Sequence, residues 1–187
     1  MRSLLLLATC LGGFGLAYAD PDKEAHGPSQ DIADLIREAA GAEAAIIAAG
    51  MIKEGQSSDL ATFLRYPTDE IAVVELKGSQ IRQALAKSVS LYPSPYDSFL
   101  QLSNMDASFK KSASPDARLE FANLGGQRLD DKRSYQVAMP ATLARGGLGF
   151  FRIWDKNQIK KTLNGITLES VVKGKAAAGS APRWRMS

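Results

Sequence analysis

Apolar residues first recur at helical spacing shortly after the start of the chain. Ile32, Leu35 and Ile36 fall on one face of a helix. Ser29 precedes them as a natural N-cap, because its hydroxyl can accept a hydrogen bond from the first turn. Gly41 follows as a residue that tolerates the left-handed conformation at a helix C-terminus. The pattern therefore predicts an amphipathic helix that begins near residue 29 and ends at residue 41.

Two runs with a different pattern predict buried strands. Residues 44–49 form a short, continuously apolar run of small side chains, which is typical of a strand buried on both faces. Residues 71–76 are rich in β-branched side chains and give the strongest strand signal in the chain. A second helix should follow, with Ser79 as its cap and with Ile81 and Leu85 on its apolar face.

The middle of the chain contains further short strand signals separated by turn residues. Residues 50–57 read as a loop, residues 59–64 as one or two helical turns, and residues 91–98 as a Tyr/Pro/Ser loop. The further strand candidates are residues 99–102, 107–110, 118–122 and 134–139. Helices alternating with strands, followed by a cluster of strands, predict a single α+β domain with a mixed β-sheet and packed helices.

The first 19 residues have the pattern of a signal peptide. Arg2 supplies the charged region, residues 4–16 the apolar region, and residues 17–19 an A-x-A cleavage site. A lipoprotein signal around Cys10 is the alternative, but Thr9 fits that motif poorly. The apolar run is too short to span a membrane as a helix. We therefore expect export, to the periplasm or outside the cell, after cleavage near Ala19.

Composition divides the rest of the chain into three parts. Residues 20–28 are polar and marked by Pro and Gly, and predict a flexible leader. Residues 29–172 form the predicted domain. Residues 173–187 are basic and rich in Ala, Gly and Ser, and predict a disordered tail. Trp184 in that tail is a candidate docking residue for a partner or an anionic surface.

Charge and cysteine content exclude some classes of function. The formal net charge is +3, and removal of Arg2 with the leader lowers it to +2 (3 − 1). This near balance argues against a dedicated nucleic-acid or membrane-surface binder. Cys10 is the single cysteine and lies in the leader, so the mature chain would have no disulfide and no thiol chemistry.

The chain carries few residues suited to catalysis. Its one histidine, His26, falls in the predicted leader, where we expect a solvated side chain. A metal site or a Ser-His-Asp triad would have to borrow that residue, and the chain has no G-x-S-x-G motif. Asp130 and Asp131 are adjacent and predict a solvated turn rather than an acid–base pair. We expect no catalytic residue, no metal and no cofactor.

Five segments together resemble a known family. The runs IADLIREAAGAEAAII, SDLATFLRY, IAVVELKGSQIRQALAKSVS, FLQLSN and SYQVAMPATLARGGLGFF occur in the order seen in the 5'-nucleotidase C-terminal, substrate-binding domain. The resemblance extends from about residue 32 to about residue 151. It implies the fold of that domain, here without the metal-bearing catalytic domain that precedes it in the family. Independent hydrolysis by this chain is therefore not expected.

The resemblance implies a ligand cleft with altered contacts on one side. The family's loop after the first strand resembles Asn-Gly-Gly-Gly-Ile-Arg, in which the Asn and the Arg reach the substrate. Ala48 replaces that Asn and Lys53 replaces that Arg. Lysine keeps the charge but lacks the planar fork of arginine that suits phosphate. Gly50 is the glycine that remains for close backbone approach to a ligand.

The other contacts implied by the resemblance concern the base and the sugar. In the family the base stacks between two aromatic rings, and Tyr66 falls on the first of these positions. Thr142 stands where the second aromatic ring belongs, and Leu148 where an Asp binds the ribose. Gly146 and Gly147 retain the glycine turn. Arg65 and Lys53 flank the expected cleft and could hold an anion or be ordinary surface charges. The candidate ligand-binding residues are Gly50, Lys53, Arg65, Tyr66, Gly146 and Gly147.

Three functional hypotheses follow. The first is a non-catalytic module that binds a nucleoside or nucleotide and is linked to nucleotide catabolism. The second is a substrate-binding subunit that acts in trans with a separate exported metallophosphoesterase, so that nucleotides are hydrolysed only in the complex. The third is a scaffold whose cleft has decayed. A cleft filled by the side chains of Met51, Thr142 and Leu148 would favour the third hypothesis.

Overall fold

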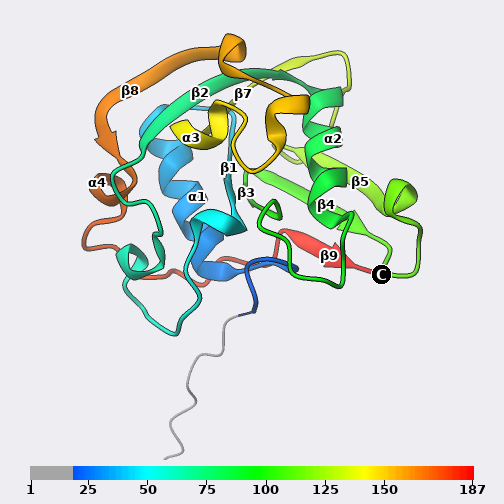
Figure 1. Ribbon diagram of the computed structural model, residues 1–187, viewed down its shortest axis with the longest axis horizontal. Coiled ribbons are helices and arrows are strands. Elements are labelled where there is room, and N and C mark those ends of the chain that lie inside the picture. Colours follow the sequence, from blue (N-terminus) through cyan, green and yellow to red (C-terminus); the bar gives the residue numbers. More distant parts are fainter. Residues whose placement is uncertain (1–18) are drawn as a thin grey trace, which may run out of the picture.

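The computed structural model describes residues 19–187, and the molecule contains two β-sheets (Figure 1). The larger sheet has five strands in the order β3-β1-β7-β2-β8. The β1–β7 pair is parallel, whereas the pairs β1–β3, β2–β7 and β2–β8 are antiparallel, so the sheet is mixed as expected. The strands of this sheet are β1 (Ala44–Ala48), β2 (Glu70–Lys77), β3 (Leu100–Ser103), β7 (Ser134–Pro140) and β8 (Ile159–Thr167).

The smaller sheet has four strands in the order β6-β5-β4-β9. Its last strand comes from the end of the described chain and pairs in parallel with β4, with Trp184 opposite Ala107. The strands are β4 (Met105–Phe109), β5 (Leu119–Leu124), β6 (Gln127–Arg128) and β9 (Trp184–Met186).

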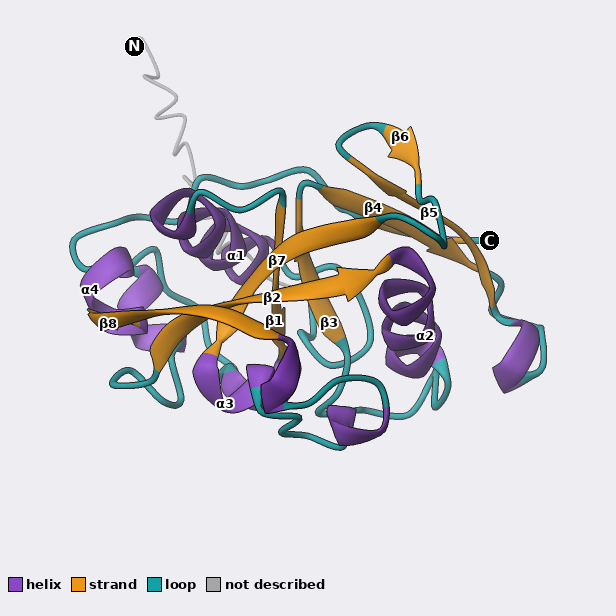
Figure 2. Cartoon of the chain, turned by 90° about the horizontal axis from the view of Figure 1, so that it is seen from above, coloured by secondary structure: helices purple, strands orange, loops and turns teal. Residues whose placement is uncertain are grey.

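Two long helices cover opposite faces of the larger sheet (Figure 2). Helix α1 packs on β1, β3 and β7, while Ile81 and Leu85 of α2 line a small apolar cavity together with Ile46 and Val137 on the other face. The α-helices are α1 (Gly27–Ala40), α2 (Gly78–Val89), α3 (Ala141–Ala144) and α4 (Leu168–Val172). The short 3-10 helices are η1 (Ala49–Met51), η2 (Leu60–Phe63), η3 (Pro115–Ala117), η4 (Phe150–Arg152) and η5 (Lys156–Gln158).

The helix boundaries differ by one or two residues from those expected. Helix α1 ends as predicted, with Gly41 in the left-handed conformation at φ 63°. It begins at Gly27 rather than after Ser29, because Pro28 already has the backbone angle that a first turn requires. Helix α2 begins at Gly78, and its cap is Lys77 rather than Ser79. The side chain of Gln80 accepts the Lys77 N–H at 3.0 Å and completes this cap.

Strand β8 is the longest strand that the sequence analysis did not predict. It lies at the edge of the larger sheet, so only one long side pairs with a neighbour. Most of its side chains are exposed, and Leu163 is its one buried residue. Lys160 reaches Glu75 on β2 at 3.1 Å. Charged side chains on an edge strand oppose further strand pairing, and they also remove the hydrophobic alternation that identifies a strand.

The segment expected to be a flexible leader is packed against β3. Gln101 organises it: the side-chain amide donates to the carbonyls of Pro21 at 2.8 Å and Glu24 at 2.7 Å, and its oxygen accepts the N–H of His26 at 3.0 Å. A buried amide that satisfies three backbone groups fixes the path of residues 21–26. The prediction of a flexible leader for residues 20–28 is therefore wrong for this segment.

The tail at residues 173–187 is likewise ordered, contrary to the prediction from its composition. Trp184 is 4% exposed, and its indole N–H donates to the carbonyl of Leu100 at 2.7 Å. Its ring packs against Phe99 and Phe109, with centroid distances of 5.2 and 5.9 Å. A large aromatic with its N–H satisfied can anchor an otherwise polar segment. Trp184 is thus a core residue rather than an exposed docking residue.

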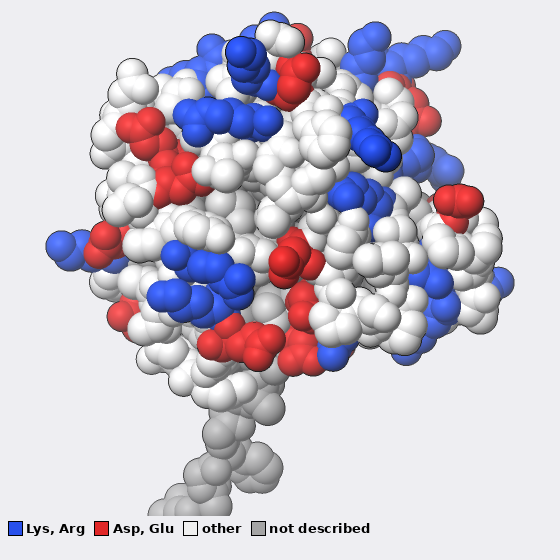
Figure 3. Space-filling model, viewed as in Figure 1, with Lys and Arg blue, Asp and Glu red and all other residues white. Residues whose placement is uncertain are grey.

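Charges of both signs are interspersed on the face shown in Figure 3. That face has no continuous basic surface, in keeping with the small net charge of +3. Within residues 19–187, no helix is both long enough and apolar enough to cross a bilayer. The predicted signal peptide lies outside the described residues, apart from Ala19.

Candidate functional site

A shallow apolar hollow lies where the loop after β1 faces the turn after α3. Its volume is about 100 Å³. Tyr66 stands on one side of it, while the opposite side comes from the segment that follows β7. The hollow is lined by Met51, Tyr66, Thr142, Leu143, Gly147 and Leu148.

Backbone pairing brings the two halves of one wall together. Ile52 and Leu64 form an antiparallel bridge. On either side of it, the Lys53 N–H donates to the carbonyl of Phe63 at 2.7 Å, and the Arg65 N–H donates to that of Met51 at 3.0 Å. The structure therefore holds the predicted residues Lys53 and Arg65 on adjacent backbone segments, with Tyr66 next in the chain. A two-residue ladder of this kind orients a loop that has no strand of its own.

The two cationic side chains of this wall differ in their contacts. The guanidinium of Arg65 donates to the carbonyl of Ile52 at 3.2 Å, which folds its head back onto the loop. The side chain of Lys53 is exposed. Lys53 and Arg65 do not line the hollow itself. Any anion that they hold would lie outside it.

The opposite wall is a glycine turn with tight internal packing. Gly146 has φ 90°, and a Cβ on it would stand 2.7 Å from the Cα of Phe151. A Cβ on Gly147 would stand 2.8 Å from the carbonyl oxygen of Thr142. The Gly147 N–H donates to that same carbonyl at 3.1 Å and closes α3. The turn therefore requires Gly146 and Gly147 for its own packing, whatever contact they make with a ligand.

Gly50 is also constrained by neighbouring protein atoms. Its N–H donates to the carbonyl of Asp97 at 2.8 Å. A Cβ at this position would lie 2.9 Å from the Cβ of Asp97 and 3.1 Å from a methyl group of Leu148. The atoms that make the close approach permitted by glycine at this position belong to Asp97 and Leu148 of the protein itself. Asp97 is a neighbour of the site that the sequence analysis missed, because no local pattern links the loop at residues 91–98 to Gly50.

Two large apolar side chains, Met51 and Leu148, form part of the lining of the hollow. Met51 is 2% exposed, and Leu148 is half-buried with its methyl group against Gly50. Leu148 adopts a φ of 54°, an uncommon value for a branched side chain. The hydroxyl of Ser98 donates to the Leu148 carbonyl at 2.7 Å and holds this conformation. Small-molecule pockets usually measure about 300–1,000 Å³, so this hollow is small by that standard.

Two aromatic side chains near the turn are exposed. Tyr66 is 51% exposed and Phe151 is 63% exposed. Phe150, which is fully buried, anchors the turn in the core, whereas Phe151 does not. The ring of Phe150 stacks on Trp154 at 4.6 Å, and the Trp154 indole donates to the carbonyl of Leu143 at 2.9 Å.

A lysine from α2 supports the turn from behind. The ammonium of Lys87 donates to the hydroxyl of Tyr96 at 2.5 Å and lies 5.5 Å from the ring centre of Phe150. Burial would raise the pKa of Tyr96, but hydrogen bonds and the charge of Lys87 outweigh it and leave the pKa below its usual value. A Cβ on Gly149 would stand 3.3 Å from the Lys87 nitrogen. The sequence alone did not indicate a role for Lys87 at this site, because its partners Tyr96 and Phe150 lie in distant segments.

The remaining candidate groups are structural. His26 is 1% exposed, so the expectation of a solvated side chain is wrong. Its Nδ1 lies 2.6 Å from the Ser29 hydroxyl. Burial lowers its pKa from 6.5 to about 4, which favours the neutral ring. Asp131 pairs with Arg82 at 2.8 Å, and Asp130 accepts the N–H of Lys132, so both lie in a turn. Among residues 19–187, no three His, Cys, Asp or Glu side chains form a group that could hold a metal ion.

The family model for the 5'-nucleotidase C-terminal domain matches residues 19–154, which is 136 of the 187 residues. The chain belongs to this family. The match covers both walls of the hollow and ends at Trp154, so the family segment positions Tyr66 and the glycine turn. A comparison with curated proteins found no match.

Solved structures of larger proteins share the fold. A 5'-nucleotidase precursor from Thermus thermophilus aligns with a TM-score of 0.73 and 21% identity, over 89% of this chain and 36% of that chain. The NAD nucleotidase of Haemophilus influenzae aligns with a TM-score of 0.62 and 14% identity, over 91% and 37%. The sulfate thiohydrolase SoxB of Thermus thermophilus, solved in complex with glycerol, aligns with a TM-score of 0.60 and 17% identity, over 90% of this chain and 33% of that chain. This chain therefore spans about a third of their length.

Proposed function

We propose that this chain is an exported, non-catalytic module that binds a nucleoside or nucleotide weakly, by stacking of the base on Tyr66. The observation that carries the proposal is the position of Tyr66. Its ring is 51% exposed at the rim of an apolar hollow, where a flat aromatic ring can lie against it. The chain belongs to a family whose solved relatives include nucleotidases, which supports the choice of a nucleoside base as the flat ring that stacks on Tyr66.

The size of the hollow limits the ligand atoms that it can enclose. A volume of about 100 Å³ leaves room for a ring but not for a whole nucleotide. The sugar and any phosphate would extend past the rim toward Lys53 and Arg65. Stacking on one aromatic ring contributes about 1–3 kcal/mol. We therefore expect dissociation constants on the order of 1 mM, which corresponds to about −4 kcal/mol.

Titration of the predicted mature chain, residues 20–187, with adenine, adenosine and AMP tests the proposal. We expect the three ligands to bind with similar dissociation constants, because the base supplies most of the contact. Amide chemical shifts should change around Met51, Tyr66 and Gly147. Tyr66→Ala should remove the changes, whereas Tyr66→Phe should keep them. The matched control is Phe151→Ala, which removes the other exposed aromatic ring without touching the lining of the hollow.

Saturable binding that survives Tyr66→Ala would contradict the proposed site. A clear preference for AMP over adenosine that depends on Lys53 would instead move the main contact to the anion. No shift changes with any of the three ligands, at concentrations of several millimolar, would rule out the proposal.

The second candidate function is a scaffold in which the cleft no longer binds a ligand. The specific observation in its favour is that the large apolar side chains of Met51 and Leu148 line the hollow, which measures only about 100 Å³. This candidate predicts the negative result of the same titration in a protein that is folded and stable. The two candidates are thus separated by one measurement.

A further inference from the structure

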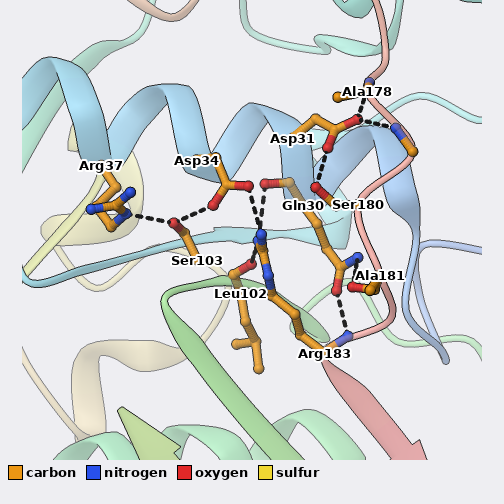
Figure 4. A network of polar contacts seen from close by, with 11 residues as sticks. Gln30, Asp31, Asp34, Arg37, Leu102, Ser103, Ala178, Ser180, Ala181 and Arg183 are labelled. Atoms are coloured by element: carbon orange, nitrogen blue, oxygen red, sulfur yellow. Dashed lines mark hydrogen bonds and ion pairs between the residues drawn. The ribbon is translucent and has the colours of Figure 1, made fainter. Parts of the chain in front are cut away.

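The segment between α4 and β9 passes across the first half of α1. We call residues 173–183 the C-terminal strap. It leaves α4 on one side of the molecule and reaches β9 on the other, under α1 in the view of Figure 1. Figure 4 shows that side chains from α1 meet it along this path. The strap therefore connects α4, which packs on β8 of the larger sheet, to β9 of the smaller sheet.

Asp31 on α1 fixes the middle of the strap. Its carboxylate accepts the backbone N–H groups of Ala178 at 2.7 Å and Gly179 at 3.2 Å, and also the hydroxyl of Ser180 (Figure 4). Asp31 is 5% exposed. A buried carboxylate that accepts three hydrogen bonds holds its donors strongly, because hydrogen bonds to a charged group exceed neutral ones in strength.

Arg183 fixes the end of the strap. Its guanidinium pairs with Asp34 at 2.6 Å and donates to the backbone carbonyls of Gln30 and Leu102. Its own N–H donates to the side chain of Gln30 at 2.8 Å. The planar fork of arginine can serve these acceptors together, which a lysine cannot do.

The front of the strap pairs with the segment that leads to the candidate site. The N–H of Leu60 donates to the carbonyl of Lys175 at 3.1 Å, and the N–H of Ala177 donates to that of Ser58 at 2.7 Å. Asp59 and Ala176 form an antiparallel bridge between them. The strap thus supplies a pairing partner for residues 58–60.

Residues 58–66, which we call the Tyr66 arm, continue from this pairing to the hollow. After η2, the arm is held by the hydrogen bonds at Lys53 and Arg65 described above. Its two ends are therefore attached to different parts of the protein: one to the strap and the other to the loop after β1. Tyr66 lies directly beyond the second attachment.

We propose that Asp31 and Arg183 are positioning residues for the candidate site, because they hold the strap against which the Tyr66 arm is ordered. The choice of a nucleoside or nucleotide as the ligand rests on the function proposed above. The expected effect on the order of the Tyr66 arm does not depend on that function. Loss of an ordinary stabilising contact would weaken the whole fold. Loss of Asp31 or Arg183 should instead loosen the Tyr66 arm more than the rest of the fold.

Hydrogen exchange of individual amides in residues 19–187 tests the inference. We expect Arg183→Met and Asp31→Ala to speed exchange at Leu60, Lys53 and Arg65 at least tenfold more than at the centre of β2. The indole N–H of Trp184 reports whether the strap end has been released. Arg183→Lys should recover part of the protection. The matched control is Arg185→Met, whose exposed side chain makes no hydrogen bond or ion pair within the described residues.

Equal acceleration at all amides in the variants would overturn the inference, because it would show a general loss of stability. Unchanged exchange in the arm, with the Trp184 N–H released, would overturn it as well. Ser180→Ala removes a single contact of Asp31 and provides a milder variant if the others do not fold; its expected effect is a smaller change at the same three amides. In the variants that release the strap, adenosine binding should weaken about five- to tenfold. If the unchanged protein binds no adenosine, the proposed function fails while the exchange result still decides the role of the strap.

Discussion

At the scale of single residues, Leu148 combines two opposing effects. Its φ of 54° places a branched side chain in the left-handed region, which costs about 1–2 kcal/mol. Its side chain recovers some of this by packing on Gly50 beside the hollow. Asparagine tolerates the left-handed region far better. We predict that Leu148→Asn changes the free energy of unfolding by less than about 1 kcal/mol, because relief of strain offsets the lost packing of a half-buried side chain.

Urea denaturation measures this effect, with Leu143→Ala as its control. Leu143 is fully buried, and its loss should cost about 2–5 kcal/mol. A loss of similar size in Leu148→Asn would show that the left-handed conformation of Leu148 carries little strain.

His26 should make the stability of the fold depend on pH. Burial lowers its pKa from 6.5 to about 4, although the charges of Asp20 and Asp31 act to raise it. The unfolded chain therefore takes up a proton near pH 6.5, which the folded chain does not do until about pH 4. The contribution is fully present above pH 6.5 and is lost as the pH falls toward 4.

We predict that the free energy of unfolding falls between pH 6.5 and about pH 4, and that His26→Gln removes this part of the slope. Denaturation at several pH values in both proteins isolates the contribution from that of the carboxylates. The same slope in both proteins would contradict the assignment to His26.

At the scale of elements, the C-terminus of α2 depends on a cation from outside the helix. The guanidinium of Arg118 donates to the carbonyls of Val89 at 2.7 Å and Ser90 at 3.0 Å, and to that of Ala113 at 3.2 Å. Arg118 is 8% exposed. A positive charge at this position also complements the negative end of the helix dipole. The contact ties α2 to the start of β5.

We predict that Arg118→Met lowers the free energy of unfolding by about 2–3 kcal/mol, since hydrogen bonds from a charged donor contribute about 1.5–3 kcal/mol. Arg128→Met, at an exposed arginine of β6, should change it by less than about 0.5 kcal/mol. Denaturation of both variants tests the difference, and equal losses would contradict a capping role for Arg118.

The elements that could be predicted are those whose own residues determine them. Strands β1 and β2 and the two long helices carry patterns that local propensity and burial favour together. The family resemblance noted in the sequence is confirmed by the family match, and with it the α+β fold. Strand β8 was missed because its exposed lysines hide the alternation. Strand β9 was missed because its one buried residue, Trp184, sits in a segment of disordered composition.

The candidate site was harder to predict than the fold. The glycine turn and the segment with Tyr66 could be placed from sequence, whereas the contacts that fill the space between them come from distant segments. Asp97 and Leu148 approach Gly50 only after folding. The titration described above tests whether these walls bind a ligand.

At the scale of the whole molecule, the two sheets are connected by contacts that are remote in sequence. Gln101 on β3 holds residues 21–26, while Trp184 packs against Phe99 and its strand β9 pairs with β4. These contacts lie about the junction of the larger and smaller sheets, where local pattern gives no information. They explain why both terminal segments are ordered despite polar composition.

The pairing of β9 with β4 also sets an order of events during biosynthesis. Ala107 cannot pair with Trp184 until the ribosome has added Trp184, 77 residues later (184 − 107). Until then β4 has an open edge and Phe109 lacks one of its aromatic neighbours. Contacts so remote in sequence form slowly, since a long loop must close before they stabilise anything. The nascent chain therefore completes the smaller sheet only at the end of its synthesis.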